Sequence, residues 1–187
     1  MYVPDESFEG RSITEISEIM GTTPAEAILR IYEKSEAYVV FNSMDEKDVD
    51  KFAKHPLIAV ASDGSSVSKD GVLSVGKPHP RSYGTNPRFI QKYVNEIKLV
   101  LIQEAVRKMT SMPAQRLGLT NRGRITPGYA ADIVIMDLPN VKENATFDNP
   151  HQYPSGITHV IVNGEIVIRD EKFTGKTPGK MITNFNS

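Results

Sequence analysis

The chain has 187 residues, 24% of them charged, and a formal net charge of −1 at pH 7. This length fits one domain or two small ones, and a near-neutral charge gives no general attraction to nucleic acid or anionic lipid. The chain has no cysteine, which excludes disulfides and thiolate metal sites and fits a cytoplasmic protein. No apolar run approaches the roughly 18 residues of a membrane span. We therefore expect neither nucleic acid nor a membrane as a partner.

The first third of the chain is predicted to alternate between helices and short strands. Ser12 and Glu15 form a capping-box pattern, and Pro24 occupies the first position of a second helix. A third helix is predicted over residues 45–54, flanked by apolar runs at 37–41 and 57–61. Continuous apolar strands separated by helices are typical of a parallel sheet that is buried on both faces.

The middle of the chain, residues 64–96, is rich in glycine and proline and loses its periodicity. Such a long irregular stretch predicts a functional loop. Helices are predicted from about residue 87, over 101–109, and from 111 to a stop at 118. Beyond them the pattern predicts a strand over 132–137 and a hairpin centred on Asn163-Gly164, the pair favoured in type I′ turns. Phe173 and its neighbours are predicted to add an edge strand to the same sheet.

Asp63 is the first candidate for chemistry because it directly follows the apolar run 57–61. Residues at the carboxyl ends of strands line the active site of a β/α barrel. A carboxylate there can ligate a cation or accept a proton from a metal-bound water. The alternative is that Asp63 and Gly64 form an ordinary turn. A side chain turned to bulk solvent, far from any concave surface, would argue against the catalytic interpretation.

The second candidate lies in KPHPRSYGTNPR, residues 77–88. Arg81 is suited to bind a substrate carboxylate through two hydrogen bonds, and Tyr83 offers a hydroxyl group. The alternative is a rigid surface loop in which Arg81 pairs with a structural carboxylate. The four histidines include no pair at a spacing of two or four residues, so the sequence offers no local histidine pair for a metal.

Several longer motifs resemble one enzyme family. Residues 113–137, PAQRLGLTNRGRITPGYAADIVIMD, resemble the C-terminal signature of the metal-dependent amidohydrolase superfamily. ASDGS at 61–65, followed by PHPRSYGTNPRFIQKYV at 78–94, narrows the resemblance to the N-acyl-D-amino-acid deacylases, or D-aminoacylases. GRSITEISEIMGTTPAEAIL, VVFNSMDEKDV and GITHVIVNGEIVI match the same branch in order, so the resemblance extends over about residues 10–179.

The resemblance implies an α/β fold. It would consist of a partial (β/α)8-barrel remnant, with the last two strands and their helices, followed by strands of a small β-sandwich domain. Residues 1–112 would be the C-terminal portion of the barrel, including a substrate loop at 64–96, and residues 113–187 the C-terminal part of the small β domain. Two strands cannot close a barrel. We therefore expect an open apolar edge that a second chain or self-association covers.

The resemblance also implies a function. The chain would be the C-terminal segment of a zinc-dependent hydrolase that cleaves the amide of N-acyl-D-amino acids. Asp63 would be the general base lying against the zinc, and a metal ligand only together with residues from absent sequence. Arg81 would hold the carboxylate of the substrate, with Tyr83 beside it. Asn86 departs from the aromatic residue usual in the family.

The family's His-x-His motif, its cysteine and its later histidine ligands have no counterpart in this sequence. We therefore expect zinc in the whole enzyme, none bound to this chain alone, and no activity of the chain by itself. Three alternatives remain open: a fragment of a cyclic-amide amidohydrolase of the dihydropyrimidinase type, the non-catalytic half of a split hydrolase, and a DNA-binding helix-turn-helix over residues 12–31. Only Arg30 would be available to meet phosphates between residues 24 and 33.

Overall fold

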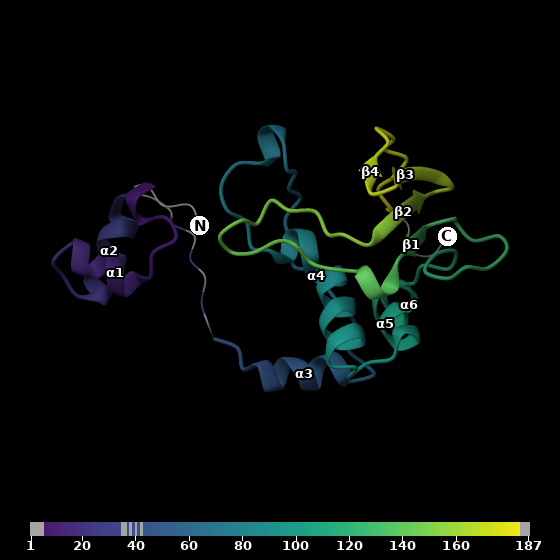
Figure 1. Cartoon of the computed structure of the whole chain (residues 1–187), viewed down its shortest axis with the longest axis horizontal. Helices are drawn as coiled ribbons and strands as arrows, with labels where there is room; N and C mark the ends of the chain where they lie inside the picture. The colour runs from purple at the N-terminus through teal and green to yellow at the C-terminus, as the bar shows by residue number, and fades with distance from the viewer. Residues whose placement is uncertain (1–5, 35–36, 38, 40, 42, 184–187) are drawn as a thin grey trace.

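The computed structural model describes residues 6–34, 37, 39, 41 and 43–183 (Figure 1). Its longer helices are α1 (Ile13–Ile19), α2 (Pro24–Lys34), α3 (Glu46–Lys54), α4 (Arg81–Phe89), α5 (Ile102–Met109) and α6 (Ser111–Arg116), and the π-helix η3 (Ile90–Glu96) continues α4. Short 3-10 helices are η1 (Glu6–Phe8), η2 (Gly71–Leu73) and η4 (Leu138–Asn140). The strands are β1 (Ile133–Met136), β2 (Ile157–Val162), β3 (Glu165–Arg169) and β4 (Lys172–Phe173).

Helices α1 and α2 form a pair that Figure 1 shows beyond one end of α3, away from the rest of the chain. The predicted capping box is confirmed, with the Glu15 N–H donating to Ser12 Oγ and the Ser12 N–H donating to the Glu15 carboxylate. These backbone and side-chain hydrogen bonds from Ser12 lower the pKa of Glu15. Ile16, Ala27 and Ile31 are buried between the helices, so the pair has a small core of its own.

The outer face of α2 differs from the prediction. The sequence gives this helix an apolar face that includes Ile28, Leu29 and Tyr32, but these side chains are 43%, 61% and 55% exposed. Only one side of α2 packs against α1, and the described residues place no other helix or strand on its opposite side. On the same helix Arg30 forms an ion pair with Glu26 at 3.0 Å, which weakens the DNA-binding alternative.

The larger core is formed by α3, the end of α4, η3, α5 and the segment that leads into α5. Its buried members are Ala53, Phe89, Tyr93, Val100 and Ala105. The elements are also joined by charge, because Lys92 on η3 pairs with Glu46 and Asp50 on α3. Burial lowers the pKa of Lys92, but these hydrogen bonds outweigh it and raise the pKa above its ordinary value.

The two predicted parallel strands are not found among the described residues. Residues 57–61 have no ladder partner and do not form a strand, and Leu57 is 78% exposed. This prediction was wrong because a buried strand needs neighbouring strands, which this part of the chain does not have. In the other run, Tyr38 and Val40 lie outside the described residues, and residues 37, 39 and 41 carry no strand.

Helix α4 begins at Arg81, six residues earlier than predicted. The irregular loop therefore spans 64–80, and the predicted substrate loop 64–96 is helical in its second half. Pro80 and Pro87 hid this helix in the sequence: Pro80 is the N-cap and Pro87 lies inside the helix, where a proline is normally taken as a break.

The sheet is antiparallel throughout, in the order β1-β2-β3-β4. The predicted hairpin is confirmed: Asn163 and Gly164 join β2 to β3 with φ values of 48° and 82°. The chain is thus α/β in content, with a four-stranded antiparallel sheet. Among the described residues, none of the helices has both the length and the apolar character required to cross a bilayer.

The motif between α6 and β1 has a structural role in this sheet. Arg122 pairs with Asp132 at the start of β1, and its other Nη donates to Asn163 Oδ1 at 2.7 Å. Asp132 also accepts from the Asn163 N–H at 2.8 Å. The glycine-rich turn is therefore fastened to the hairpin turn, and the Asp that opens β1 serves this junction.

Candidate functional site

Asp63 follows the segment 57–61 and has a left-handed backbone conformation, with a φ of 46°. Its carboxylate Oδ2 is 2.8 Å from an Nη of Arg81, and 88% of its side chain is exposed. The structure thus brings together the two main candidate residues, which are 18 positions apart in sequence. The described residues leave the carboxylate largely in solvent, which is not the enclosed setting expected of a catalytic base.

Gly64 allows this approach by having no side chain. A Cβ at this position would be 2.9 Å from Ser82 Cα on α4. The Ser65 N–H also donates to Ser82 Oγ at 3.3 Å. The unusual φ belongs to Asp63, whereas Gly64 is needed for close packing against the first turn of α4.

Arg81 is held at the start of α4 by the residues around it. Its N–H donates to His79 Nδ1 at 3.0 Å, and the His79 ring meets Phe147 edge-on at 4.9 Å. Partial burial of the imidazole lowers the pKa of His79, and the positive charge of Arg81 acts in the same direction. Neutral His79 is therefore the form that accepts this hydrogen bond. Arg81 pairs with a carboxylate of this chain, as the second of its two sequence interpretations expected.

Tyr83 is fixed by contacts rather than free in a loop. Its hydroxyl lies 2.8 Å from His151 Nδ1, and His151 Nε2 lies 2.8 Å from the carbonyl oxygen of Gly76. In the His151 tautomer with a proton on Nε2, Nε2–H donates a hydrogen bond to the Gly76 carbonyl oxygen. Nδ1 then accepts a hydrogen bond from the Tyr83 hydroxyl. Burial raises the pKa of Tyr83, and the nearby Tyr153 ring, 5.6 Å away, adds to this effect.

The segment 142–155 packs against α4 and was not predicted to belong to the site. Glu143 pairs with Arg88 at 3.1 Å and is only 9% exposed in its side chain. A Cβ on Gly84 would meet the Glu143 side chain, so any larger residue there would displace that side chain. With His151 and Phe147, these contacts make the segment a support for Arg81 and Tyr83. Only the glycine in SYGT hinted at the approach.

A zinc ion does not fit the described residues by themselves. They contain no group of three His, Cys, Asp or Glu side chains that could hold a metal ion. Asp63 is a single oxygen donor and is already paired with Arg81. A zinc site normally takes three or four protein ligands. At most, Asp63 would add one ligand to a set supplied by other polypeptide.

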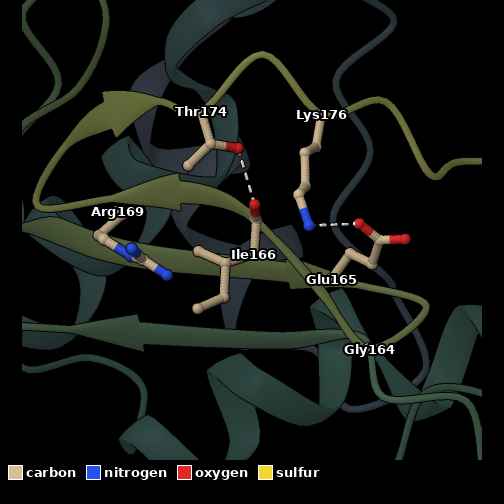
Figure 2. Close-up of a pocket in the computed structure, with 6 residues that line it drawn as sticks. All are labelled: Gly164, Glu165, Ile166, Arg169, Thr174 and Lys176. Atoms are coloured by element: carbon tan, nitrogen blue, oxygen red, sulfur yellow. Dashed lines mark hydrogen bonds and ion pairs between the residues drawn. The ribbon is translucent and has the colours of Figure 1, made fainter.

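A depression on the hairpin is a separate feature (Figure 2). It is lined by Gly164, Glu165, Ile166, Arg169, Thr174 and Lys176. Glu165 pairs with Lys176 at 2.7 Å, and the Thr174 hydroxyl donates to the Ile166 carbonyl. Figure 2 shows these two contacts among the lining residues, with Arg169 drawn without a contact to the others. The depression contains none of the candidate site residues.

Comparison with known proteins identifies the family. The model of the amidohydrolase family matches residues 25–168, and the chain belongs to this family. It is 35% identical over 173 residues to the N-acyl-D-aspartate deacylase of Alcaligenes xylosoxydans xylosoxydans, covering 92% of this chain and 33% of that enzyme.

Solved structures agree with this placement. A D-aminoacylase studied for its binuclear metal centre superposes with a TM-score of 0.81 at 34% identity, over 92% of this chain and 34% of that one. The N-acyl-D-glutamate deacylase of Bordetella bronchiseptica, complexed with zinc and a phosphonate inhibitor, gives a TM-score of 0.75 at 34% identity, over 84% and 31%. The chain spans about a third of the length of the curated relatives it matches.

Proposed function

We propose that this chain is the C-terminal segment of a zinc-dependent amidohydrolase that cleaves the amide bond of N-acyl-D-amino acids. The observation that carries the proposal is the match of residues 25–168 to the amidohydrolase family, to which the structure adds that Asp63 and Arg81 lie 2.8 Å apart. Similarity to deacylases of N-acyl-D-aspartate and N-acyl-D-glutamate supports the substrate class. Residues 1–112 are proposed as the barrel portion and 113–187 as part of the small β domain.

In this proposal Asp63 is the general base. Its carboxylate accepts a proton from the attacking water and returns it to the nitrogen that leaves as the free amine. In this chain one of its oxygens, Oδ2, is paired with Arg81, and 88% of the side chain is exposed. The cover that such a site requires would come from polypeptide outside this chain.

Arg81 is proposed to bind the carboxylate of the N-acyl amino acid. Its guanidinium group can donate two parallel hydrogen bonds to a carboxylate, a geometry that lysine cannot reproduce. Tyr83 is two residues further along α4, with its hydroxyl anchored on His151. It is proposed to limit the position of the substrate rather than to exchange a proton, because burial raises the pKa of its hydroxyl.

The chain alone is proposed to be inactive and to require a second polypeptide or self-association. Its described residues provide no metal-binding cluster. Large apolar side chains are exposed in the two segments that precede Asp63 and α5. Leu57 is 78% exposed and Leu101 is 76% exposed. Covering such side chains is the usual driving force for association.

Complementation tests the proposal directly. The purified chain is mixed with the portion of N-acyl-D-aspartate deacylase that it does not match, in the presence of zinc, and hydrolysis of N-acetyl-D-aspartate is measured. We expect activity only in the mixture. Asp63→Asn should lower kcat at least about 100-fold, since it removes the proton acceptor. Arg81→Gln should mainly raise KM.

Asp70→Asn is the matched control, because it neutralises another exposed carboxylate of the same loop. It should leave both kinetic constants unchanged. Equal activity of Asp63→Asn and the unmodified chain would refute the role of Asp63. Hydrolysis by the chain with zinc alone would refute its proposed inactivity. Hydrolysis of dihydrouracil in place of N-acetyl-D-aspartate would favour the cyclic-amide alternative.

A further inference from the structure

Lys108, on the last turn of α5, is buried to an unusual degree for a charged residue. It is 0% exposed. The described part of the chain gives its ammonium group no carboxylate within ion-pair distance, and burial lowers the pKa of Lys108. An isolated buried charge is costly, whereas an apolar side chain of similar length would fill the same space without that cost. The contacts of its ammonium group therefore indicate what the residue does.

Those contacts all reach the segment that leads to Asp63. Lys108 Nζ donates to the carbonyl oxygen of His55 and, at 2.7 Å, to that of Ile58. The Val60 N–H in turn donates to the Lys108 carbonyl oxygen at 3.2 Å. The segment forms no strand, so its backbone groups need partners from elsewhere. Lys108 supplies three of these hydrogen bonds.

Arg107 adds a fourth contact from the same helical turn. Its Nη2 donates to the Pro56 carbonyl oxygen at 2.5 Å, and its guanidinium group is oriented by two hydrogen bonds of 2.7 Å to Glu104. The carbonyl oxygens of residues 55, 56 and 58 are thus all held by cations of α5. A cation at the C-terminal end of a helix is also favoured by the helix dipole.

We propose that Lys108 is a positioning residue, which fixes residues 55–60 so that the turn at Asp63 presents its carboxylate to Arg81. The inference rests on the role proposed for Asp63. Val60 is the last residue fastened to α5, and Asp63 follows three positions later, so releasing the segment would leave Asp63 anchored only from the side of α4. Lys108 does not itself contact the reacting groups.

The experiment compares Lys108→Met with Lys108→Arg in the full chain. Amide hydrogen exchange is measured at Val60 and in α6, and the side-chain NMR signal of Arg81 reports its pairing with Asp63. Lys108→Met should increase exchange at Val60 at least about tenfold more than in α6. It should also shift the Arg81 signal to the position found in Asp63→Asn. Lys108→Arg should restore most of both properties.

Val94→Ala is the control for a general loss of core packing, since Val94 packs against the same core from η3. It should increase exchange evenly and leave the Arg81 signal in place. If Lys108→Met behaves as Val94→Ala does, Lys108 is only a core residue and the inference is overturned.

Should Lys108→Met fail to fold, Arg107→Gln is the deciding variant. Faster hydrogen exchange at Val60 than in α6 supports the inference, and an equal increase at both places overturns it. These measurements need no substrate. Failed complementation would therefore reject the proposed function without changing the outcome of the exchange and NMR measurements on Lys108.

Discussion

The β2–β3 hairpin and the segment 57–61 are similar in sequence and different in structure. Both are short runs rich in valine, isoleucine and leucine or alanine, and both were predicted as strands. The hairpin pairs along its length, with β1 on its other side, whereas 57–61 has no strand partner and is held by side chains of α5. Apolar composition thus indicates a preference for extended structure, but a strand forms only where a neighbour satisfies its backbone groups.

The largest effect that would sharpen this comparison is expected at Gly156, at the entrance to β2. A Cβ there would be 2.5 Å from the Asn140 carbonyl oxygen, at a φ of 80°. Gly156→Ala should lower the free energy of unfolding by about 3 kcal/mol, measured by urea denaturation. Gly175→Ala has a similar φ of 82° but open space around it, and should cost only about 1 kcal/mol. Equal losses would show that the close packing at β2 is unimportant.

A smaller effect is expected at the hairpin turn. Asn163 accepts from Arg122 and donates to the Pro178 carbonyl oxygen at 2.9 Å, at a φ of 48°. Asn163→Ala should cost about 1–2 kcal/mol in thermal or urea unfolding, because alanine tolerates this φ poorly and makes neither bond. Asn163→Gly keeps the backbone conformation and should lose less. A greater loss for glycine would place the turn's stability in the side chain alone.

The third prediction concerns the anchor of Arg81. Since the pKa of His79 is lowered on folding, the unfolded chain binds more protons between that lowered pKa and about 6.5. Stability contributed by neutral His79 is therefore present above about pH 6.5 and is lost as the pH falls below it. His79→Asn, which retains a hydrogen-bond acceptor, should reduce the fall in Tm between pH 7.5 and 5.5. An unchanged pH dependence would contradict this account.

The smallest effect is expected in the unpaired segment. Leu57→Ser should change the free energy of unfolding by no more than about 0.5 kcal/mol, because the side chain is 78% exposed. Val60→Ala, at a position packed against the main core, should cost about 1 kcal/mol. Sedimentation velocity on the same variants tests association, which Leu57→Ser should weaken. A large loss of stability in Leu57→Ser would mean that the segment is covered after all.

Local signals in the sequence predicted the local structure well. The capping box at Ser12 and Glu15, the proline start of α2 and the Asn163-Gly164 turn were all confirmed, because each is satisfied by residues only a few positions apart. Helix α5 was confirmed for the same reason. The start of α4 was missed because prolines normally interrupt helices, whereas here one caps α4 and the other is accommodated within it.

The candidate site was predicted in its residues but not in its contacts. Asp63, Arg81 and Tyr83 were chosen from short motifs, and their catalytic and binding roles stay predictions. The surrounding contacts could not be found in this way, since Glu143, Phe147 and His151 lie 55 to 68 residues beyond Arg88, His79 and Tyr83, which they contact. Nor does spacing reveal that Lys108 reaches back to Ile58.

The Asp63–Arg81 ion pair has a consequence for any acid that arrives from solution. The guanidinium group is already neutralised by an anion tethered beside it, so an incoming carboxylate must compete with that anion instead of filling an empty position. For an exposed pair the competition weakens the apparent affinity by no more than about fivefold. In return, each successful displacement leaves the internal carboxylate without its counter-ion at the moment the acid docks.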